Sequence, residues 1–207
     1  MTPLRHVAYD ELTVLYLPHL DGGGRTFGQD VVRFVRDEIG PVGHALEWCA
    51  GPGFIGLALL AAGLCDRLTL ADVNPAAVRM ARQTVRHNDL AERVDVVESD
   101  GLDGLPSHRF DLVVANPPHT PGGRLFPRWG PEILYVDQDW SAHRRFYAGI
   151  RDFLAPGGSI VLQENGLFSG AADFAGMITA AGLDLVAERP SVDQYYFVWS
   201  RNGGASC

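Results

Sequence analysis

The spacing of apolar and polar positions changes along the chain. From residue 44 onward, short runs rich in β-branched residues alternate with stretches in which apolar residues recur every three or four positions. This alternation is typical of a parallel β-sheet built from β-α-β units. The runs that predict strands are 44–49, 67–73, 93–97, 110–115, 159–163, 183–188 and 194–199. We therefore expect an α/β fold with a doubly wound, mostly parallel sheet of seven strands.

The clearest helix is predicted over residues 75–88. Asn74 can cap it and Pro75 suits its first turn. Its apolar residues at helical spacing are Ala77, Val78, Ala81 and Val85. Only residues 189–193 separate the last two predicted strands, which is too short for a crossover helix. These two strands are therefore expected to form a C-terminal antiparallel hairpin.

The first forty residues have a different pattern. It predicts a strand or hairpin over 7–17, a glycine loop at 21–24 and an amphipathic helix over 29–39. A chain of 207 residues that is 46% apolar can bury one sizeable core. We expect an N-terminal extension, residues 1–40, joined to a core of residues 41–207 in a single compact domain.

Composition narrows the kind of protein and of partner. The net charge of −8 gives no bulk attraction for nucleic acid and slightly favours cationic or small neutral substrates. Three scattered cysteines indicate reduced thiols, with no disulfide framework and no metal site. No apolar run approaches membrane-spanning length and the N-terminus has no signal sequence, so a soluble cytoplasmic protein is expected. The oligomeric state stays open.

The motif Asn116-Pro117-Pro118-His119 closes the apolar run 110–115. Two prolines make the turn rigid and hold Asn116 at the carboxyl end of a strand, where open α/β sheets bind ligands. The Asn116 side-chain oxygen and the Pro117 carbonyl offer two acceptors for a planar NH or NH2 group, whose nitrogen can then point at an electrophile. Taken alone, the motif would be an ordinary turn.

A glycine turn follows the first core strand. Gly51, Gly53 and Gly56 satisfy the G-x-G-x-x-G pattern of NAD sites, with Asp72 about 20 residues further on. A dinucleotide-dependent reductase is therefore an alternative. Glu47 argues against it, because a carboxylate would lie badly beside a pyrophosphate but could accept from the amino group of a zwitterionic, adenosine-bearing ligand.

Acidic and amide side chains end four successive predicted strands. Asp72 can accept from both ribose hydroxyls, and Asp100 from an adenine amine. Val73 and Leu102 could sandwich the adenine ring. Each acid alone would be an ordinary loop residue or helix cap, but four polar residues at four strand ends are unlikely to arise by chance. The four are Glu47, Asp72, Asp100 and Asn116.

With these motifs in this order, the chain resembles the class I S-adenosylmethionine-dependent methyltransferases over residues 26–165. Among these Rossmann-like enzymes it is similar to the amino-group methyltransferases with an Asn-Pro-Pro-aromatic motif, above all the release-factor glutamine methyltransferases. The resemblance implies S-adenosylmethionine as cofactor and a catalytic role for Asn116 and the Pro117 carbonyl. The cofactor contacts that it implies are Glu47, Gly51, Gly53, Asp72 and Asp100.

Two positions depart from the family pattern. Cys49 stands where the motif usually has its first glycine. His119 stands where the family usually has Tyr, Phe or Trp to stack on the target group. Imidazole can stack, but it can also accept a proton, so we expect His119 to belong to the catalytic site.

The acids near the motif favour a particular substrate. They are Glu132, Asp137, Asp139 and Glu164. Together they suggest a small molecule with a guanidine or amide nitrogen, best a free arginine-like amino acid, which carboxylates would orient. A protein glutamine, an RNA or DNA exocyclic amine, or a silent cofactor-binding domain are the alternatives. The Pro- and Gly-rich segment 120–139 is expected to be a substrate lid.

Overall fold

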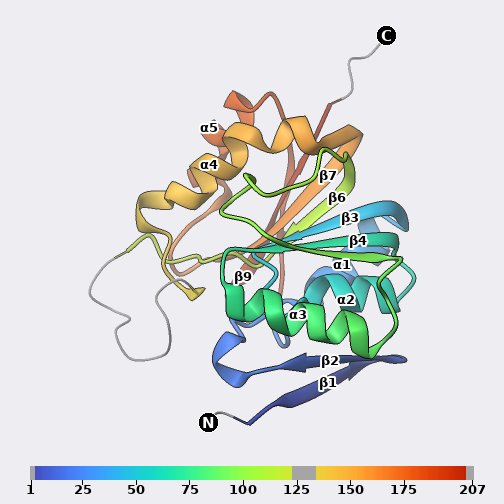
Figure 1. Cartoon of the computed structure of the whole chain (residues 1–207). Helices are drawn as coiled ribbons and strands as arrows, with labels where there is room; N and C mark the ends of the chain where they lie inside the picture. The colour runs from blue at the N-terminus through green and yellow to red at the C-terminus, as the bar shows by residue number, and fades with distance from the viewer. Residues whose placement is uncertain (1–2, 123–133, 204–207) are drawn as a thin grey trace.

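The computed structural model describes residues 3–122 and 134–203, to which every structural statement below refers. The chain forms an α/β structure around a seven-stranded sheet in the order β5-β4-β3-β6-β7-β9-β8 (Figure 1). The parallel strands are β3 (Val42–Trp48), β4 (Cys65–Asp72), β5 (Val94–Glu98), β6 (Phe110–Ala115) and β7 (Leu154–Asn165). The predicted doubly wound, mostly parallel sheet is confirmed.

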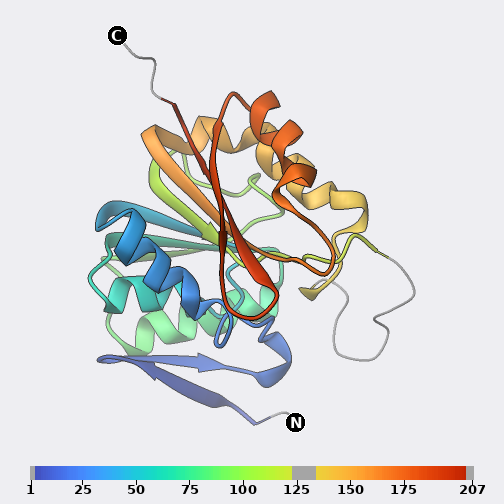
Figure 2. The same cartoon turned by 180° about the vertical axis from the view of Figure 1, so that it is seen from behind.

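The sheet ends in the predicted antiparallel hairpin, seen from behind in red in Figure 2. Strands β8 (Asp184–Pro190) and β9 (Tyr195–Arg201) pair antiparallel with each other, and β9 also pairs antiparallel with β7. Strand β7 begins five residues earlier than its apolar run predicted, because Leu154 already pairs with Phe110. The Pro and Gly residues that follow Leu154 resemble a turn in the sequence, although they lie within the strand.

Helices cover both faces of the sheet. On one face lie α1 (Gln29–Glu38), α2 (Phe54–Ala61) and α3 (Pro75–His87), and on the other lie α4 (Ser141–Gly149) and α5 (Ala171–Ala180) (Figure 1). Helix α2 is almost entirely apolar because it is buried on nearly all sides. Asn74 caps α3 through its side-chain oxygen, which accepts from the Ala76 N–H at 3.0 Å, as predicted.

The N-terminal hairpin packs across α3. Strands β1 (Arg5–Tyr9) and β2 (Leu12–Tyr16) form a separate two-stranded sheet, and α1 follows after a short 3-10 turn, Pro18–Leu20. Asn88 holds the hairpin by accepting from the Thr13 N–H and donating to the Thr13 carbonyl, both at 2.9 Å. The segment between the 3-10 turn and α1, residues 21–28, begins with the glycine loop, residues 21–24, which lies at the carboxyl edge of the main sheet.

Candidate active site

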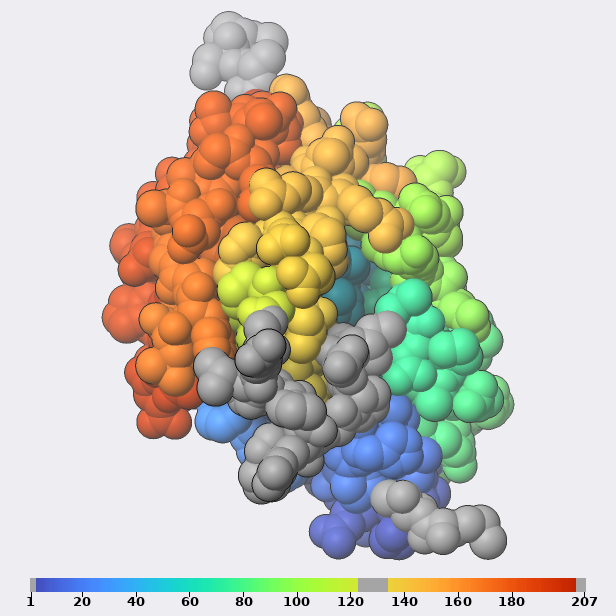
Figure 3. Space-filling model, turned by 90° about the vertical axis from the view of Figure 1, so that its left-hand side faces the viewer, coloured from blue at the N-terminus to red at the C-terminus, as the bar shows by residue number. Residues whose placement is uncertain are grey.

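Two neighbouring cavities lie at the carboxyl ends of the parallel strands. The larger, about 510 Å³, is lined by the ends of β3, β4 and β6 and by the start of α4. Figure 3 shows a hollow between the yellow residues around α4 and the green residues around α3. The smaller, about 380 Å³, is lined by His119 and by the aromatic side chains of Phe27, Phe168 and Tyr195. Gly22 of the glycine loop lines both cavities.

Glu47 closes the inner end of the larger cavity and caps α2. Its carboxylate accepts from the backbone N–H of Ile55 at 3.2 Å and of Gly56 at 2.7 Å. Burial raises its pKa to about 8, although these two hydrogen bonds act in the opposite direction. A side chain at Gly56 would lie 2.8 Å from the Glu47 carboxylate, so only glycine fits there. Both Glu47 oxygens therefore bind the start of α2, whereas the sequence analysis expected them to face the amino group of a ligand.

This arrangement counts against the dinucleotide alternative. An NAD pyrophosphate binds to the free N–H groups at the start of the helix that follows the glycine turn. Here the Glu47 carboxylate already occupies those donors. A phosphate at the same place would find the N–H groups of Ile55 and Gly56 already bound.

Asp72 stands at the end of β4 and lines the larger cavity as predicted. One carboxylate oxygen accepts from the Gly51 N–H at 2.7 Å and the other from the Asn74 N–H at 2.8 Å. Each oxygen keeps a second lone pair, so the carboxylate can still accept from a pair of hydroxyls. Burial raises its pKa, and the two backbone hydrogen bonds oppose this shift.

Of the three residues predicted to contact adenine, two line the larger cavity. Val73 and Asp100 line the larger cavity, and Asp100 forms an ion pair at 3.0 Å with Arg145 of α4. Both side chains of that pair are largely exposed. Leu102 packs instead against the core on the α4 side and is not among the residues that line the cavity.

Asn116 lines the larger cavity with its amide held in one orientation. Its Nδ2 donates to the Gly22 carbonyl at 3.2 Å. Its Oδ1 is buried and has no hydrogen-bond partner among the described residues. Gly23 has a φ of +104°, which glycine adopts readily, and a Cβ there would crowd the Phe27 ring at 3.1 Å and contact the Asn116 amide at 3.4 Å. Sequence reasoning gave the glycine loop no role, although its run of three glycines was a visible signal.

The remaining motif residues are distributed around the turn. Pro117 is buried and is not among the residues that line either cavity, whereas Pro118 lines the larger one. Cys49 has a φ of +54°, a conformation that favours glycine, which explains why a glycine is usual at this position. Its side chain also lines the larger cavity, and burial raises the pKa of the thiol.

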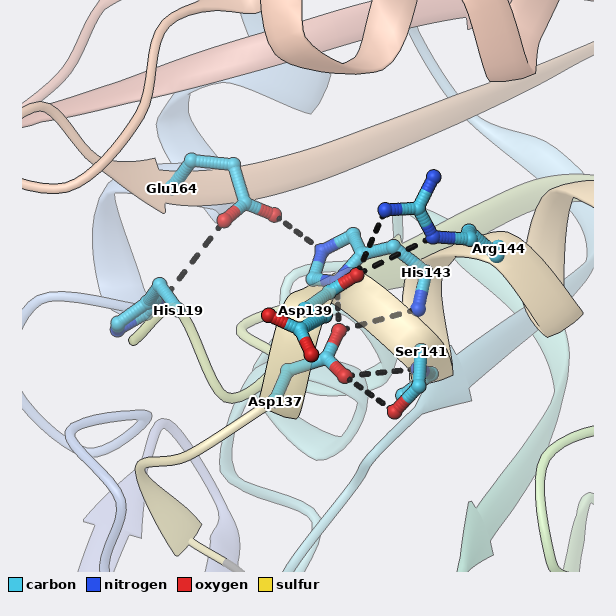
Figure 4. A network of polar contacts seen from close by, with 8 residues as sticks. His119, Asp137, Asp139, Ser141, His143, Arg144 and Glu164 are labelled. Atoms are coloured by element: carbon cyan, nitrogen blue, oxygen red, sulfur yellow. Dashed lines mark hydrogen bonds and ion pairs between the residues drawn. The ribbon is translucent and has the colours of Figure 1, made fainter. Parts of the chain in front are cut away.

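His119 belongs to a buried chain of alternating acids and histidines (Figure 4). Its Nδ1 lies 3.9 Å from Oε2 of Glu164, at the end of β7. The other Glu164 oxygen lies 2.9 Å from Nε2 of His143, on α4, and Nδ1 of His143 lies 2.6 Å from the Asp137 carboxylate. Burial acts to lower the pKa of His143, but the two carboxylates outweigh it and raise this pKa to about 9.

The described members of the predicted carboxylate cluster, Asp137, Asp139 and Glu164, do not gather around a site for a cationic substrate. Asp137 is buried and starts α4, accepting from the N–H groups of Ala142 and His143 at 2.7 and 3.1 Å. Glu164 is buried against His143, and Asp139 is exposed. Glu132 and most of the predicted lid lie outside the described residues. The two best-placed acids thus neutralise His143, a residue that sequence reasoning missed because a lone histidine in a helix carries no pattern.

Among residues 3–122 and 134–203, no group of His, Cys, Asp and Glu side chains is arranged to hold a metal ion. Within the same ranges, no helix has the length and apolar character needed to cross a membrane.

The sequence has relatives among known proteins. The family described as "Methyltransferase small domain" matches residues 31–167. Ribosomal RNA small subunit methyltransferase C of Pseudomonas aeruginosa (strain LESB58) is 32% identical over 159 residues, which are 77% of this chain and 43% of that protein. The release factor glutamine methyltransferase of Cereibacter sphaeroides is 30% identical over 161 residues, 74% of this chain and 57% of the relative. The chain thus spans about half the length of these curated relatives.

The fold has relatives among solved structures. The structure of the T. Thermophilus 16S rRNA N2 G1207 methyltransferase in complex with AdoMet and guanosine superposes with a TM-score of 0.67 at 18% identity, covering 97% of this chain and 50% of that one. A glycopeptide N-methyltransferase complexed with S-adenosyl-L-methionine gives a TM-score of 0.64 at 18% identity, covering 85% of this chain and 94% of that one. At these identities the likeness establishes the fold.

Proposed function

The chain belongs to the methyltransferase small domain family, and from this premise we propose that it transfers a methyl group from S-adenosylmethionine to a planar nitrogen. The observation that carries the proposal is the Asn116 amide. Its Nδ2 is occupied by the Gly22 carbonyl, while its buried Oδ1 lacks a partner within the described part of the chain. A buried acceptor without a donor costs about 1–3 kcal/mol, and an N–H of the substrate would supply that donor.

The residues of the larger cavity fit this cofactor. The cavity is lined by acids at three successive strand ends, with Glu47 innermost, Asp72 in the middle and Asp100 at the exposed side. Asp72 would accept from the ribose hydroxyls, and Val73 would contact the adenine ring. Bound there, S-adenosylmethionine supplies an electrophilic methyl group on a sulfonium.

The chain contributes position and hydrogen bonding. Asn116 Oδ1 would accept an N–H of the substrate nitrogen and so fix its direction relative to the methyl group. As the nitrogen gains a bond, its remaining N–H becomes more acidic and the hydrogen bond to Oδ1 strengthens. The Pro117 carbonyl is proposed as the second acceptor.

For the acceptor, we place an exocyclic amine of an RNA base first. The smaller cavity next to Asn116 is walled by aromatic rings, with Phe27 stacked on Tyr195 at 4.7 Å and His119 edge-on to Tyr195. Flat walls of this kind suit an unstacked base. The relatives are named for ribosomal RNA and for protein glutamine. The free arginine-like substrate has no support from them, and two of the carboxylates predicted to bind it, Asp137 and Glu164, bind His143 instead.

The test is a methyl-transfer screen with labelled cofactor. The acceptors are deproteinised ribosomal RNA, a release-factor peptide that contains glutamine, and free arginine. We expect label in the RNA, at a nitrogen of a base, with binding that weakens steeply as salt is added. Label in the peptide alone would show that the acceptor is an amide and leave the N-methyltransferase intact. Label in free arginine alone would restore the small-molecule substrate, and no label in any acceptor would refute the activity.

A further inference from the structure

A buried relay of four side chains connects the two cavities. It runs from His119 through Glu164 and His143 to Asp137, and Figure 4 shows these residues facing one another. We propose that His119 takes up the proton that the substrate nitrogen releases on methylation, and that Glu164 is the positioning residue that holds and stabilises His119 in this role. The inference rests on the proposed N-methyl transfer.

Two unpaired atoms carry the argument. His119 Nδ1 and Glu164 Oε2 are both buried, and neither has a hydrogen-bond partner among residues 3–122 and 134–203. They lie 3.9 Å apart, just beyond hydrogen-bonding distance. An unpaired base beside an unpaired carboxylate is costly in a resting protein. The pair becomes satisfied once the imidazole carries a second proton, because the imidazolium can donate to the carboxylate after a shift of about 1 Å.

The far side of the relay keeps Glu164 in place. Its Oε1 is bound to His143 Nε2 at 2.9 Å, and the His143 ring is stacked on Phe174 with 4.9 Å between ring centroids. Asp137 fixes the other ring nitrogen at 2.6 Å and is itself held by the first turn of α4. With a carboxylate on each side, His143 is an imidazolium, and its positive charge binds Glu164. The Glu164 carboxyl is therefore held in a fixed position beside His119.

His119 lies in the same turn as Asn116. It follows Asn116 by three residues in a turn made rigid by two prolines. Gly22, whose carbonyl holds the Asn116 amide, lines both the cavity of Asn116 and the cavity of His119. A base that enters the smaller cavity with its amine toward Asn116 thus passes the imidazole.

The chemistry balances without a further reactant. The nitrogen lone pair forms the new N–CH3 bond, and the electrons of the broken S–CH3 bond stay on sulfur. The nitrogen then carries a positive charge and passes one proton to the His119 imidazole, and the resulting imidazolium faces Glu164. Burial lowers the pKa of His119, so the ring starts neutral and able to accept. The phenyl or phenol ring usual at this position could stack but could not accept this proton.

Several other polar groups surround His119. Glu164 and the Gln163 backbone act to raise its pKa, while the charged His143 acts to lower it. The titratable side chains that line the same cavity are Asp21, Tyr135 and Tyr195. Asp21 is paired with Arg25 at 2.8 Å, so its charge is largely neutralised.

The first test needs neither cofactor nor substrate. Histidine resonances of the ligand-free full chain are titrated by NMR in the wild type, in Glu164→Gln and in Glu92→Gln, whose side chain is exposed. We expect the midpoint of His119 to move to lower pH in Glu164→Gln, because the nearest stabilising charge is gone, and to stay in place in Glu92→Gln. An unmoved midpoint in Glu164→Gln would overturn the relay.

The second test is the pH profile of methyl transfer in a single turnover. The wild-type rate should fall at low pH as His119 protonates. In His119→Phe, which restores an aromatic ring, this acidic limb should vanish and the plateau rate should fall on the order of 100-fold. Glu164→Gln should move the limb to lower pH, and Glu92→Gln should match the wild type. Cofactor affinity, measured by calorimetry, should stay within a few-fold in all variants.

The two tests distinguish a failure of the proton role of His119 from a failure of the proposed N-methyl transfer. If His119→Phe keeps the wild-type rate and profile, the proton role is wrong while the methyltransferase stands. If the wild type methylates no acceptor, the proposed function and the proton role fail together, whereas the NMR result still decides whether Glu164 controls His119.

Discussion

Among single residues, Asn116 combines a fixed group with an available one. Its NH2 is bound by Gly22 and its oxygen has no partner within residues 3–122 and 134–203, so replacing it removes the acceptor without disturbing the strand that carries it. We expect Asn116→Ala to abolish methyl transfer while cofactor affinity stays within a few-fold. Asn202→Ala is the matched control, since Asn202 also donates to a backbone carbonyl but lies outside both cavities. Wild-type turnover in Asn116→Ala would contradict the amino-group mechanism.

Cys49 shows a local conflict between side chain and backbone. A residue with a Cβ at a φ of +54° is strained by about 1 kcal/mol, which glycine avoids. We therefore expect Cys49→Gly to be more stable than Cys49→Ala by about 1 kcal/mol in urea unfolding. At Cys65, buried at the start of β4, the order should reverse, because glycine weakens a strand. The same order at both cysteines would rule out backbone strain at Cys49.

At the scale of elements, the start of α2 depends on a carboxyl that is buried beneath it. Glu47 has a pKa of about 8 in the folded chain, against 4.5 for an ordinary glutamate. Between these two values the folded state holds a proton that the unfolded state has released, so stability falls as pH rises through this window. Glu47→Gln cannot titrate.

We therefore expect the free energy of unfolding of Glu47→Gln, measured relative to that of the wild type, to be higher at pH 8 than at pH 5. Urea unfolding of both proteins at the two pH values checks this. Glu98→Gln, an exposed carboxyl at the end of β5, should keep the wild-type pH dependence. A difference between Glu47→Gln and the wild type that does not vary with pH would show that Glu47 does not control this pH response.

Elements were also the part of the structure most readable from sequence. The change from short apolar runs to helical spacing predicted the sheet, and the five-residue gap before the last strand predicted its antiparallel end. The polar residues at strand ends indicated which edge carries the site. The sequence pattern did not show which side chains from distant segments would face one another. Asp137 and Glu164 were expected to face a substrate, but His143, brought in by α4, binds both.

For the whole molecule, cofactor binding and stability are linked. A ligand that binds only the folded chain stabilises it by about 2.7 kcal/mol at 100 times its dissociation constant. Asp72→Ala should lose the ribose hydrogen bonds, about 2 kcal/mol or roughly 30-fold in affinity. At the same concentration, its stabilisation by S-adenosylmethionine should then fall below about 1 kcal/mol.

Thermal unfolding with and without ligand measures this effect. Asp111→Ala is the control, since Asp111 also accepts a backbone N–H, from His44, but is not among the residues that line the larger cavity. It should keep the full rise with S-adenosylmethionine, and NAD should stabilise neither protein. Stabilisation by NAD instead would reverse the cofactor assignment.

The carbonyl that holds the Asn116 amide comes from Gly22, ahead of the family match at residues 31–167. The part of the chain that matches the family is therefore smaller than the part that forms the candidate site. A shortened chain that begins at residue 29 would keep the residues of all seven strands and Asn116 itself, but its amide would be free to turn over and offer NH2 where we propose that its oxygen binds the substrate. Grafting this pocket onto another scaffold would mean carrying the N-terminal loop with it.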